Sequence, residues 1–403
     1  MSHPHPLYQW QQTLAQKLPV LSKPQASVLA LWSFGMVLAR SCGQTSVVSV
    51  LASVLNANPD ALRQRLREFC YDAQDKAGAK RASLEVGVCF APLLAWVLSW
   101  WEAHQIALAI DATTLGNRFY VLAVSVVYRG CAIPVAWTVL RAEQKHAWRK
   151  EWLRLLRQVR TDLPPKMTVI VLADRGLYAR WLFRRIVRLG WHPLLRINNR
   201  GSFRPKAEGG FVPFLALVSA PGRVWCGVGT AFTTKTSRLD CTLLACWQED
   251  CQDPWLLLSD LPPEAGEACW YGLRAWIEQG FKIIKRAGWQ WQTTRMSDPQ
   301  RAERLWLCVA VATLWLLSVA GEADTALAEG TLPDLSLRPL RSRSGTRLRL
   351  VRVFRQGWIR LLTALLNQQP LPEGRFVPEP WPTSRRLTTA AQPPPQSLQK
   401  RAA

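Results

Sequence analysis

The feature that most constrains the fold is a series of short apolar segments between residues 104 and 198. "IALAID" (106–111), "FYVLAVSVVY" and "CAIPVAWTVL" follow one another closely, and a two-residue "RG" turn joins the last two. Apolar runs of this length, bounded by turn residues, are typical of strands buried on both faces. "TVIVLAD" (168–174) and "HPLLRIN" (192–198) predict two more strands, and helical patterns precede each of them.

The predicted order is three strands, a helix, a strand, a helix and a strand, which is the order of an α/β, ribonuclease-H-like catalytic core. The chain has 403 residues, enough for two or three domains. We predict five parts: a helical N-terminal DNA-binding region (1–100), the first part of the core (101–199), a β-rich insertion (200–266), the second part of the core (267–325), and a basic, Pro-rich C-terminal region with a disordered tail (326–403).

The N-terminal region predicts helices, two of them within residues 45–72. Asn58 suits a helix N-cap and Pro59 suits the first helical position of the second helix. Arg63 and Arg67 are four residues apart and therefore share a face of that helix. The pair predicts a helix-turn-helix that contacts DNA; the alternative is an ordinary helical hairpin that has an arginine face.

The charge of the chain indicates a polyanionic partner. Lys and Arg number 51 against 28 Asp and Glu, a net charge of +23. Such a positive field favours nucleic acid binding, although ribosomal RNA or a membrane surface fits the charge equally well. Charge thus indicates a class of partner without indicating an activity.

Two apolar runs, residues 88–101 and 305–321, are shorter than the roughly 20 residues of a membrane span, so we predict buried core helices and no membrane association. The ten cysteines show no CxxC pair, and the N-terminus has no signal-peptide pattern. We therefore expect reduced thiols in a cytoplasmic protein.

Two aspartates end predicted buried strands: Asp111 ends the first and Asp174 ends the fourth. Either one alone suits an ordinary turn or helix cap. Strand ends of an α/β sheet converge on one edge, where a later helix carrying Glu278 can join them. Three clustered carboxylates repel one another unless a cation lies among them, and all-oxygen ligation favours Mg²⁺ or Mn²⁺. We predict two such ions, suited to phosphodiester chemistry.

The segment "YGLRAWIEQGFKIIKRAGWQW" (271–291) surrounds that glutamate. At about 100° per residue, one helix face carries five polar side chains within roughly 80°: Tyr271, Arg274, Glu278, Lys282 and Lys285. One interpretation is a solvated face with an i,i+4 Arg–Glu pair; the other is a site that combines a metal ligand with phosphate-binding cations.

Three motifs in this order resemble a DDE transposase of a bacterial insertion sequence: "DATTLG" (111–116), "ADRGLYA" (173–179) and "YGLRAWIEQGFKIIK" (271–285). The last matches Y-x2-R-x3-E-x6-K, the signature of the group named after insertion sequence four, and "GWQW" after it is similar too. The resemblance covers residues from about 104 to 320. It implies Asp111, Asp174 and Glu278 as the metal-binding catalytic triad, a β insertion before the third member, and phosphate contacts by Tyr271, Arg274 and Lys285.

The resemblance further implies an enzyme that cleaves at terminal inverted repeats and joins the 3′ ends to target DNA. We expect a nucleoid-associated bacterial protein that forms a homodimer on paired ends. Two alternatives remain: a structure-specific nuclease on the same core, and an inactive DNA-binding descendant of a transposase. Trp225 or Trp247 of the insertion could stack on a flipped base, unless both are packing residues.

Overall fold

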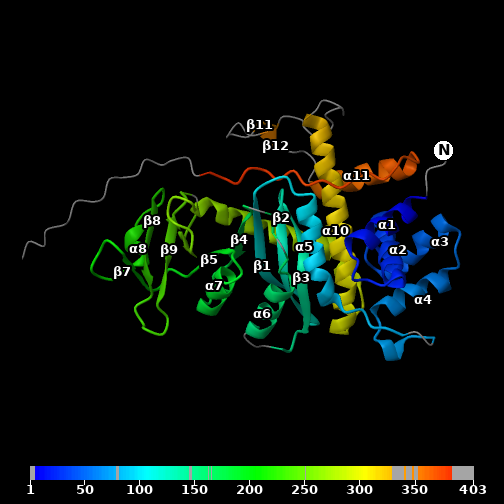
Figure 1. Cartoon of the computed structure of the whole chain (residues 1–403), viewed down its shortest axis with the longest axis horizontal. Coiled ribbons are helices and arrows are strands. Elements are labelled where there is room, and N and C mark those ends of the chain that lie inside the picture. The colour runs from blue at the N-terminus through cyan, green and yellow to red at the C-terminus, as the bar shows by residue number, and fades with distance from the viewer. Residues whose placement is uncertain are drawn as a thin grey trace, which may run out of the picture.

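The computed structural model describes residues 5–78, 81–144, 148–161, 163–164, 166–249, 251–328, 340–341, 347–348 and 353–383. A long mixed sheet forms the centre of the molecule (Figure 1). The N-terminal helices lie beyond one end of it, and the strands of residues 202–246 lie at the other end.

The core of the sheet has the predicted element order. It consists of β1 (Gln105–Leu115), β2 (Phe119–Tyr128), β3 (Cys131–Arg141), α6 (Arg149–Gln158), β4 (Thr168–Ala173), α7 (Arg180–Val187) and β5 (His192–Arg196). The first three strands pair antiparallel, and β4 and β5 are parallel to β1 and β4 respectively. The prediction of a mixed α/β fold is confirmed.

Strand β1 is longer than predicted. It continues four residues beyond Asp111, which pairs with Ala123 of β2. The prediction that Asp111 ends its strand is therefore wrong, because the polar residues after it, including Thr113 and Thr114, still pair with β2 in a hairpin. Asp174 does follow the last residue of β4, as predicted.

The strands after residue 200 extend the same sheet. They are β6 (Ser202–Pro205), β7 (Val212–Pro213), β8 (Val224–Ala231), β9 (Leu239–Cys246) and β10 (Trp255–Ser259), with the short helix α8 (Phe214–Leu217) between β7 and β8. Strand β10 pairs antiparallel with β5, which gives one ten-stranded sheet in the order β3-β2-β1-β4-β5-β10-β9-β8-β6-β7. The strands predicted here exist, but their continuity with the core sheet was not predictable from local patterns.

Helices cover both faces of the core strands. Adjacent residues of a strand point to opposite faces. Phe119 stacks on Trp291, whereas its neighbour Tyr120 packs against Trp148, which precedes α6. The segment around Trp291 and helix α6 therefore lie on opposite faces of the sheet.

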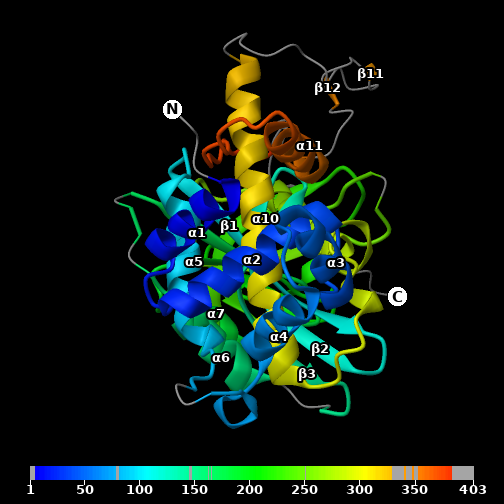
Figure 2. The same ribbon diagram turned by 90° about the vertical axis from the view of Figure 1, so that its right-hand side faces the viewer.

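The N-terminal region consists of α1 (Pro6–Lys17), α2 (Lys23–Ala39), α3 (Gln44–Leu55), α4 (Pro59–Cys70) and, after the short 3₁₀ turns Ala73–Asp75 and Val86–Cys89, α5 (Phe90–Ser99). Asn58 caps α4 by accepting from two backbone N–H groups, and Pro59 is its first residue, as predicted. Helices α1 to α4 face the viewer in Figure 2, and α2 passes in front of α10.

The region is fixed to the core by polar contacts as well as apolar ones. The backbone N–H of Cys42 donates to Trp289 at 2.7 Å. Arg304, which is only 5% exposed, forms an ion pair with Asp72 and donates to the carbonyl of Cys70 at 2.7 Å.

Helix α10 (Pro299–Ala328) is the central helix of the fold. Its segment Pro299–Glu322 is long and apolar enough to cross a membrane by length and composition, and 94% of its most apolar window is buried inside the protein. The helix is longer than the apolar run in the sequence because polar residues at its start continue the same helix. Its burial matches the predicted core helix, and such a helix is weak evidence for a span.

Part of the C-terminal region packs on this core. Helix α11 (Val353–Leu366) crosses α10, and the indole N–H of Trp358 donates to the carbonyl of Val37 at 2.9 Å. Phe376 is fully buried and pairs with Trp101 in an isolated bridge. The composition of the region predicted none of this, and the predicted disordered tail lies outside the described residues.

Where α11 crosses α10, a glycine of α11 has no room for a larger side chain. A Cβ on Gly357 would lie 1.8 Å from the carbonyl oxygen of Leu316. Gly357→Ala should lower the free energy of unfolding by about 1–3 kcal/mol, because the backbone clash outweighs the roughly 1 kcal/mol that alanine normally adds in a helix. Urea denaturation measures the change. Gly209→Ala is the control, since its Cβ meets nothing within 4 Å, and an equal effect of both changes would contradict the prediction.

Candidate active site

Three carboxylates from separate elements meet at one guanidinium. Arg274 donates to Asp111 at 2.9 Å, to Glu278 at 2.8 Å and to Asp174 at 3.5 Å. Asp111 lies on β1, Asp174 directly follows β4, and Glu278 lies on α9 (Ala275–Lys282). The structure therefore brings together the three acidic residues predicted from the sequence, with Arg274 between them.

The two aspartates are neighbours because β1 and β4 are adjacent and parallel. Ala109 pairs with Leu172, so the residues two positions further along each strand reach the same edge of the sheet. The helix is brought close by a glycine: a Cβ on Gly280 would lie 2.8 Å from the Cβ of Ala132 on β3. Sheet register and this close approach together decide the geometry of the cluster.

The segment that carries Arg274 and Glu278 is not one α-helix. Residues Ala268–Arg274 form a 3₁₀ helix, α9 follows, and Ile283–Ala287 form a π-helical turn. A 3₁₀ helix turns faster per residue than an α-helix and a π-helix more slowly, so the predicted five-residue stripe at 100° per residue is wrong. The predicted Arg274–Glu278 ion pair at i,i+4 is present, at 2.8 Å.

Tyr271 departs most from the predicted polar face. It is 5% exposed, its ring meets Trp255 edge-on at 5.2 Å, and the guanidinium of Arg196 lies 5.9 Å from its centre. Burial raises the pKa of Tyr271, an effect that the nearby Arg274 and Arg196 oppose. The side chain is therefore a buried neighbour of Arg274 and does not belong to an exposed stripe.

Partial burial from solvent dominates the electrostatics of the carboxylate cluster. Burial is the main cause that raises the pKa of Asp111; Arg274 and a hydrogen bond from the N–H of Ala112 lower it, and Asp174 and Glu278 raise it. Asp174 accepts from the N–H groups of Gly176 and Leu177 at 3.0 and 3.1 Å, so it is both a turn residue and a cluster member. An added cation would relieve the repulsion among the three carboxylates.

The carboxylate oxygens of the three acidic residues are ligands of the kind that a divalent metal ion prefers. In this structure the guanidinium of Arg274 lies where such an ion would be bound. Within the described residues, no group of three His, Cys, Asp or Glu side chains is assembled to hold a metal ion. The oxygens nevertheless point at one common positive centre, as carboxylates around Mg²⁺ or Mn²⁺ do. The buried Nε of Arg274 has no hydrogen-bond partner in this arrangement, which leaves the guanidinium incompletely satisfied. Holding a metal requires Arg274 to move.

The two lysines after Glu278 differ in environment. Lys282 is exposed, whereas Lys285, in the π-helical turn, is half-buried. Burial, and to a lesser extent Arg286, lower the pKa of Lys285. Trp289 and Trp291 of "GWQW" are fully buried, so this motif anchors the segment in the core and does not contact solvent.

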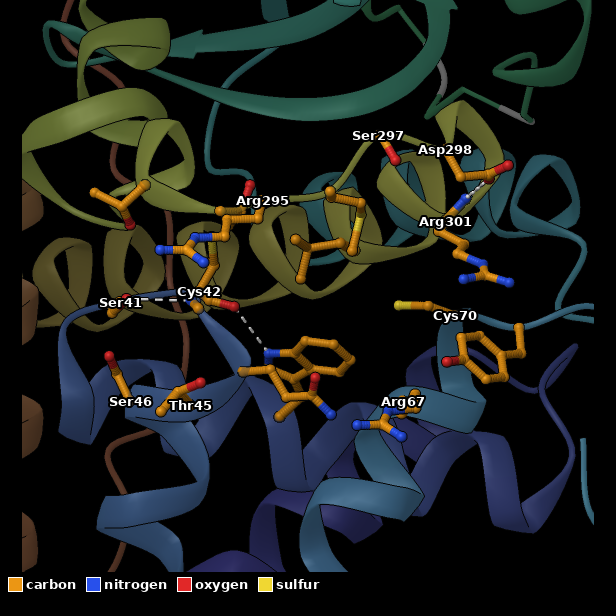
Figure 3. A pocket seen from close by; sticks show the side chains of 18 residues that line it. Ser41, Cys42, Thr45, Ser46, Arg67, Cys70, Arg295, Ser297, Asp298 and Arg301 are labelled. Atoms are coloured by element: carbon orange, nitrogen blue, oxygen red, sulfur yellow. Dashed lines mark hydrogen bonds between the residues drawn. The ribbon is translucent and has the colours of Figure 1, made fainter. Parts of the chain in front are cut away.

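Of the two N-terminal arginines, only Arg67 faces a cavity. Arg63 pairs with Asp60 at 2.8 Å on the surface of α4. Arg67 lines a pocket of about 620 Å³ between the N-terminal helices and residues 293–301, together with Arg295 and Arg301 (Figure 3). The guanidinium of Arg301 lies 4.1 Å from the ring centre of Tyr71 and forms an ion pair with Asp75 at 3.3 Å. Among the described residues, neither Arg67 nor Arg295 forms an ion pair.

Arg295 and the pocket were missed at the sequence level. The segment that carries Arg295 follows the "GWQW" motif, and Arg118 holds it by donating to the carbonyls of Thr294 and Met296 at 2.7 and 2.8 Å. No local pattern joins residues near 67 and 295, so only the packed chain reveals this cavity.

The two tryptophans proposed for base stacking are half-buried. Trp225 meets Phe203 edge-on at 5.6 Å and lies over Gly227, and the indole N–H of Trp247 donates to the carbonyl of Cys251 at 2.9 Å. These contacts are what packing residues make. A role in base stacking stays a prediction for both.

The sequence of the region that carries the three carboxylates matches a known protein family. Residues 103–315 match the family described as the transposase DDE domain, and the matched part is more than half of the chain. The chain therefore belongs to this family. The matched region, from β1 to the middle of α10, is a DDE domain of the kind found in transposases.

No curated protein has a sequence that matches this chain. Among solved structures, a piggyBac transposase synaptic complex with hairpin DNA is similar over 65% of this chain and 53% of its own, with 9% identity and a TM-score of 0.31. The chain thus spans about half the length of that protein. A similarity of this size supports no argument about the present site.

The three-way contact of Arg274 predicts a stability effect. In EDTA, Arg274→Met should lower the free energy of unfolding by about 1–3 kcal/mol, because it leaves clustered carboxylates without their cation. Adding Asp111→Asn should recover part of that loss, which a double-mutant cycle of urea denaturation measures. If the two changes are simply additive, the ionic cluster does not contribute as described. Arg63→Met, at an exposed pair, is the control and should change stability by less than about 1 kcal/mol.

Proposed function

We propose that the protein is the transposase of a bacterial insertion sequence, of the group with the Y-x2-R-x3-E-x6-K signature. It cleaves DNA at the terminal inverted repeats and joins the 3′ ends to target DNA. The observation that carries this proposal is the convergence of Asp111, Asp174 and Glu278 on one cation-binding point in a chain of the DDE family.

The proposal includes a ribonuclease-H-like core, and the strand order β3-β2-β1-β4-β5 supports it. Residues 1–100 form the helical DNA-binding region, 101–199 and 267–325 the core, 200–266 the insertion, and 326–403 the C-terminal region. The protein acts as a homodimer on paired ends at the bacterial nucleoid.

Members of the DDE family typically use divalent metal ions. Asp111, Asp174 and Glu278 are the residues that would hold Mg²⁺ or Mn²⁺, two ions in our proposal. When bound, such ions activate the attacking oxygen and stabilise the leaving oxygen of a phosphodiester. The protein supplies the rigid part of the site: two adjacent strands fix the aspartates, and the packed α9 fixes the glutamate.

Arg274 has two anionic partners in this proposal. One partner is the group of three carboxylates, which the guanidinium contacts with its side chain only 13% exposed. When these side chains hold a metal, the guanidinium turns to the phosphate of the DNA beside them, where its planar donors suit phosphate oxygens. Lys285 also contacts phosphate, and Tyr271 acts as the support beneath them.

The pocket with Arg67, Arg295 and Arg301 is the proposed N-terminal contact to the transposon end. Two of its three arginines have no described ion pair, and the pocket joins the N-terminal helices to the segment after the catalytic helix. DNA held there therefore has a fixed position relative to the carboxylates. Arg63 contributes little, because Asp60 already neutralises it.

Metal-dependent cleavage is the first test. The protein should nick DNA that contains a transposon end with Mg²⁺ or Mn²⁺ but not in EDTA. Asp111→Asn, Asp174→Asn and Glu278→Gln should each reduce nicking by at least 10³-fold while still binding the DNA, because the electrostatic stabilisation of the reacting phosphate is lost. Asp253→Asn, an exposed carboxylate outside the cluster, is the control. Nicking by the Asp174→Asn protein at the wild-type rate would reject the triad.

The phosphate contacts predict a difference in salt dependence. Lys285→Ala should lower the slope of log K for end DNA against log salt by about one unit, because one fewer counterion is released. Lys282→Ala, on the exposed turn beside it, should lower the slope by less. Fluorescence anisotropy in EDTA measures both slopes. An unchanged slope for Lys285→Ala would exclude it as a phosphate contact.

A further inference from the structure

A second cationic surface lies in the groove between α6 and α7. The groove encloses about 530 Å³, and six arginines line it: Arg149, Arg157, Arg180, Arg184, Arg185 and Arg188. No Asp or Glu is among its described lining residues; Leu153 and Trp181 complete it. We call this surface the arginine groove.

The arginines form two facing rows. Arg180, Arg184 and Arg188 follow one another at four-residue spacing along α7, and Arg149 and Arg157 are eight apart on α6, so each row lies on one helix face. Like charges at i,i+4 destabilise a helix by a few tenths of a kcal/mol per pair. The α7 row has no acidic residue on its own helix, so its charges are not neutralised by neighbours along the helix.

The internal contacts of the arginine groove leave most of its charge free. Within the described part of the chain, none of the six forms an ion pair. Arg180 donates to the carbonyl of Arg238 at 3.3 Å, and Arg149 lies 5.6 Å from the ring centre of Trp181. The Nε of Arg185 is buried without a hydrogen-bond partner. Apart from that buried Nε and the donor of Arg180, the guanidinium groups that line the groove make no hydrogen bond within the described structure, so they can contact an anion there.

The arginine groove begins at the edge of the sheet that holds the carboxylates. Helix α7 starts six residues after Asp174. Helix α6 follows β3, and β3 ends at the same edge of the sheet. Its last residue is level with Phe119 of β2 and, through it, with Leu115 of β1, which is four residues beyond Asp111. The first turns of both helices thus lie near the catalytic edge.

The arginine groove also lies on the opposite face of the sheet from the segment that follows the catalytic helix. Tyr120 packs against Trp148 at the start of α6, whereas Phe119 stacks on Trp291 on the other face. The pocket with Arg67 and Arg295 is built from that other segment. The protein therefore has two separate cationic surfaces, the arginine groove on one face of the sheet and a pocket built partly from the segment on the other face.

We propose that the arginine groove binds the backbone of the target DNA. This inference rests on the proposed function, in which a second DNA segment must reach the carboxylates to accept the 3′ end. Arginines that contact phosphates bind without regard to sequence, which suits a target and contributes nothing to recognition of a particular end sequence.

The test compares Arg184→Ala/Arg188→Ala with Lys206→Ala/Lys235→Ala, a double change of equal charge at exposed positions outside the groove. In EDTA, the slope of log K against log salt for a duplex without transposon ends should fall by about two units in the groove variant, and its affinity at moderate salt by about tenfold. Joining of a pre-cleaved end to a plasmid should fall by a similar factor. The control should change each quantity by less, and Arg184→Lys/Arg188→Lys should retain the slope.

Binding of end DNA and nicking separate this inference from the proposed function. The groove variant should bind and nick end DNA within about twofold of the wild type, and its melting temperature should not fall, since the change removes like-charge repulsion. Normal joining by the groove variant overturns the inference, and so does a loss of end binding equal to its loss of target binding. Absence of metal-dependent nicking in the wild type rejects the proposed function, and with it the assignment to target DNA.

Discussion

The contact of Arg274 with three carboxylates is the interaction on which the site depends. Its partners Asp111 and Asp174 lie 163 and 100 residues away in the chain, and only Glu278 is local. Without a cation, their mutual repulsion would oppose the packing of α9 on the sheet. The guanidinium offsets that repulsion by contacting all three carboxylates. The same contact sets a requirement, because a metal and Arg274 cannot occupy one point.

The packing around this contact is correspondingly rigid. The glycine at 280 lets α9 approach β3, and the tryptophans of "GWQW" lock the following segment into the core. The π-helical turn between them accommodates one extra residue in the helix, a feature that is frequent at functional sites. The N-terminal helices then bind to this segment through the Cys42–Trp289 hydrogen bond. The segment that follows α9 is therefore in direct contact with the helices that line the Arg67 pocket.

The positive charge of the chain is concentrated on particular surfaces. One cationic pocket lies between the N-terminal helices and residues 293–301, and the arginine groove lies on the other face of the sheet. A reaction that joins two DNA segments needs both to reach one set of carboxylates. In the proposed function, the two surfaces provide separate places for the two DNA segments.

The sequence by itself determined the order of the core strands and helices, the cap at Asn58, and the identity of the three acidic residues. These follow from local patterns: apolar runs, turn residues and motif spacing. The side-chain directions in residues 271–291 could not be predicted from the sequence. A single helical period does not describe a 3₁₀ turn, an α-helix and a π turn in succession. Burial of Tyr271 and the ionic role of Arg274 depend on residues of distant strands. The joining of β10 to β5, the Arg67 pocket and the arginine groove likewise exist only in the packed chain, because each is made of segments whose sequences carry no signal of one another.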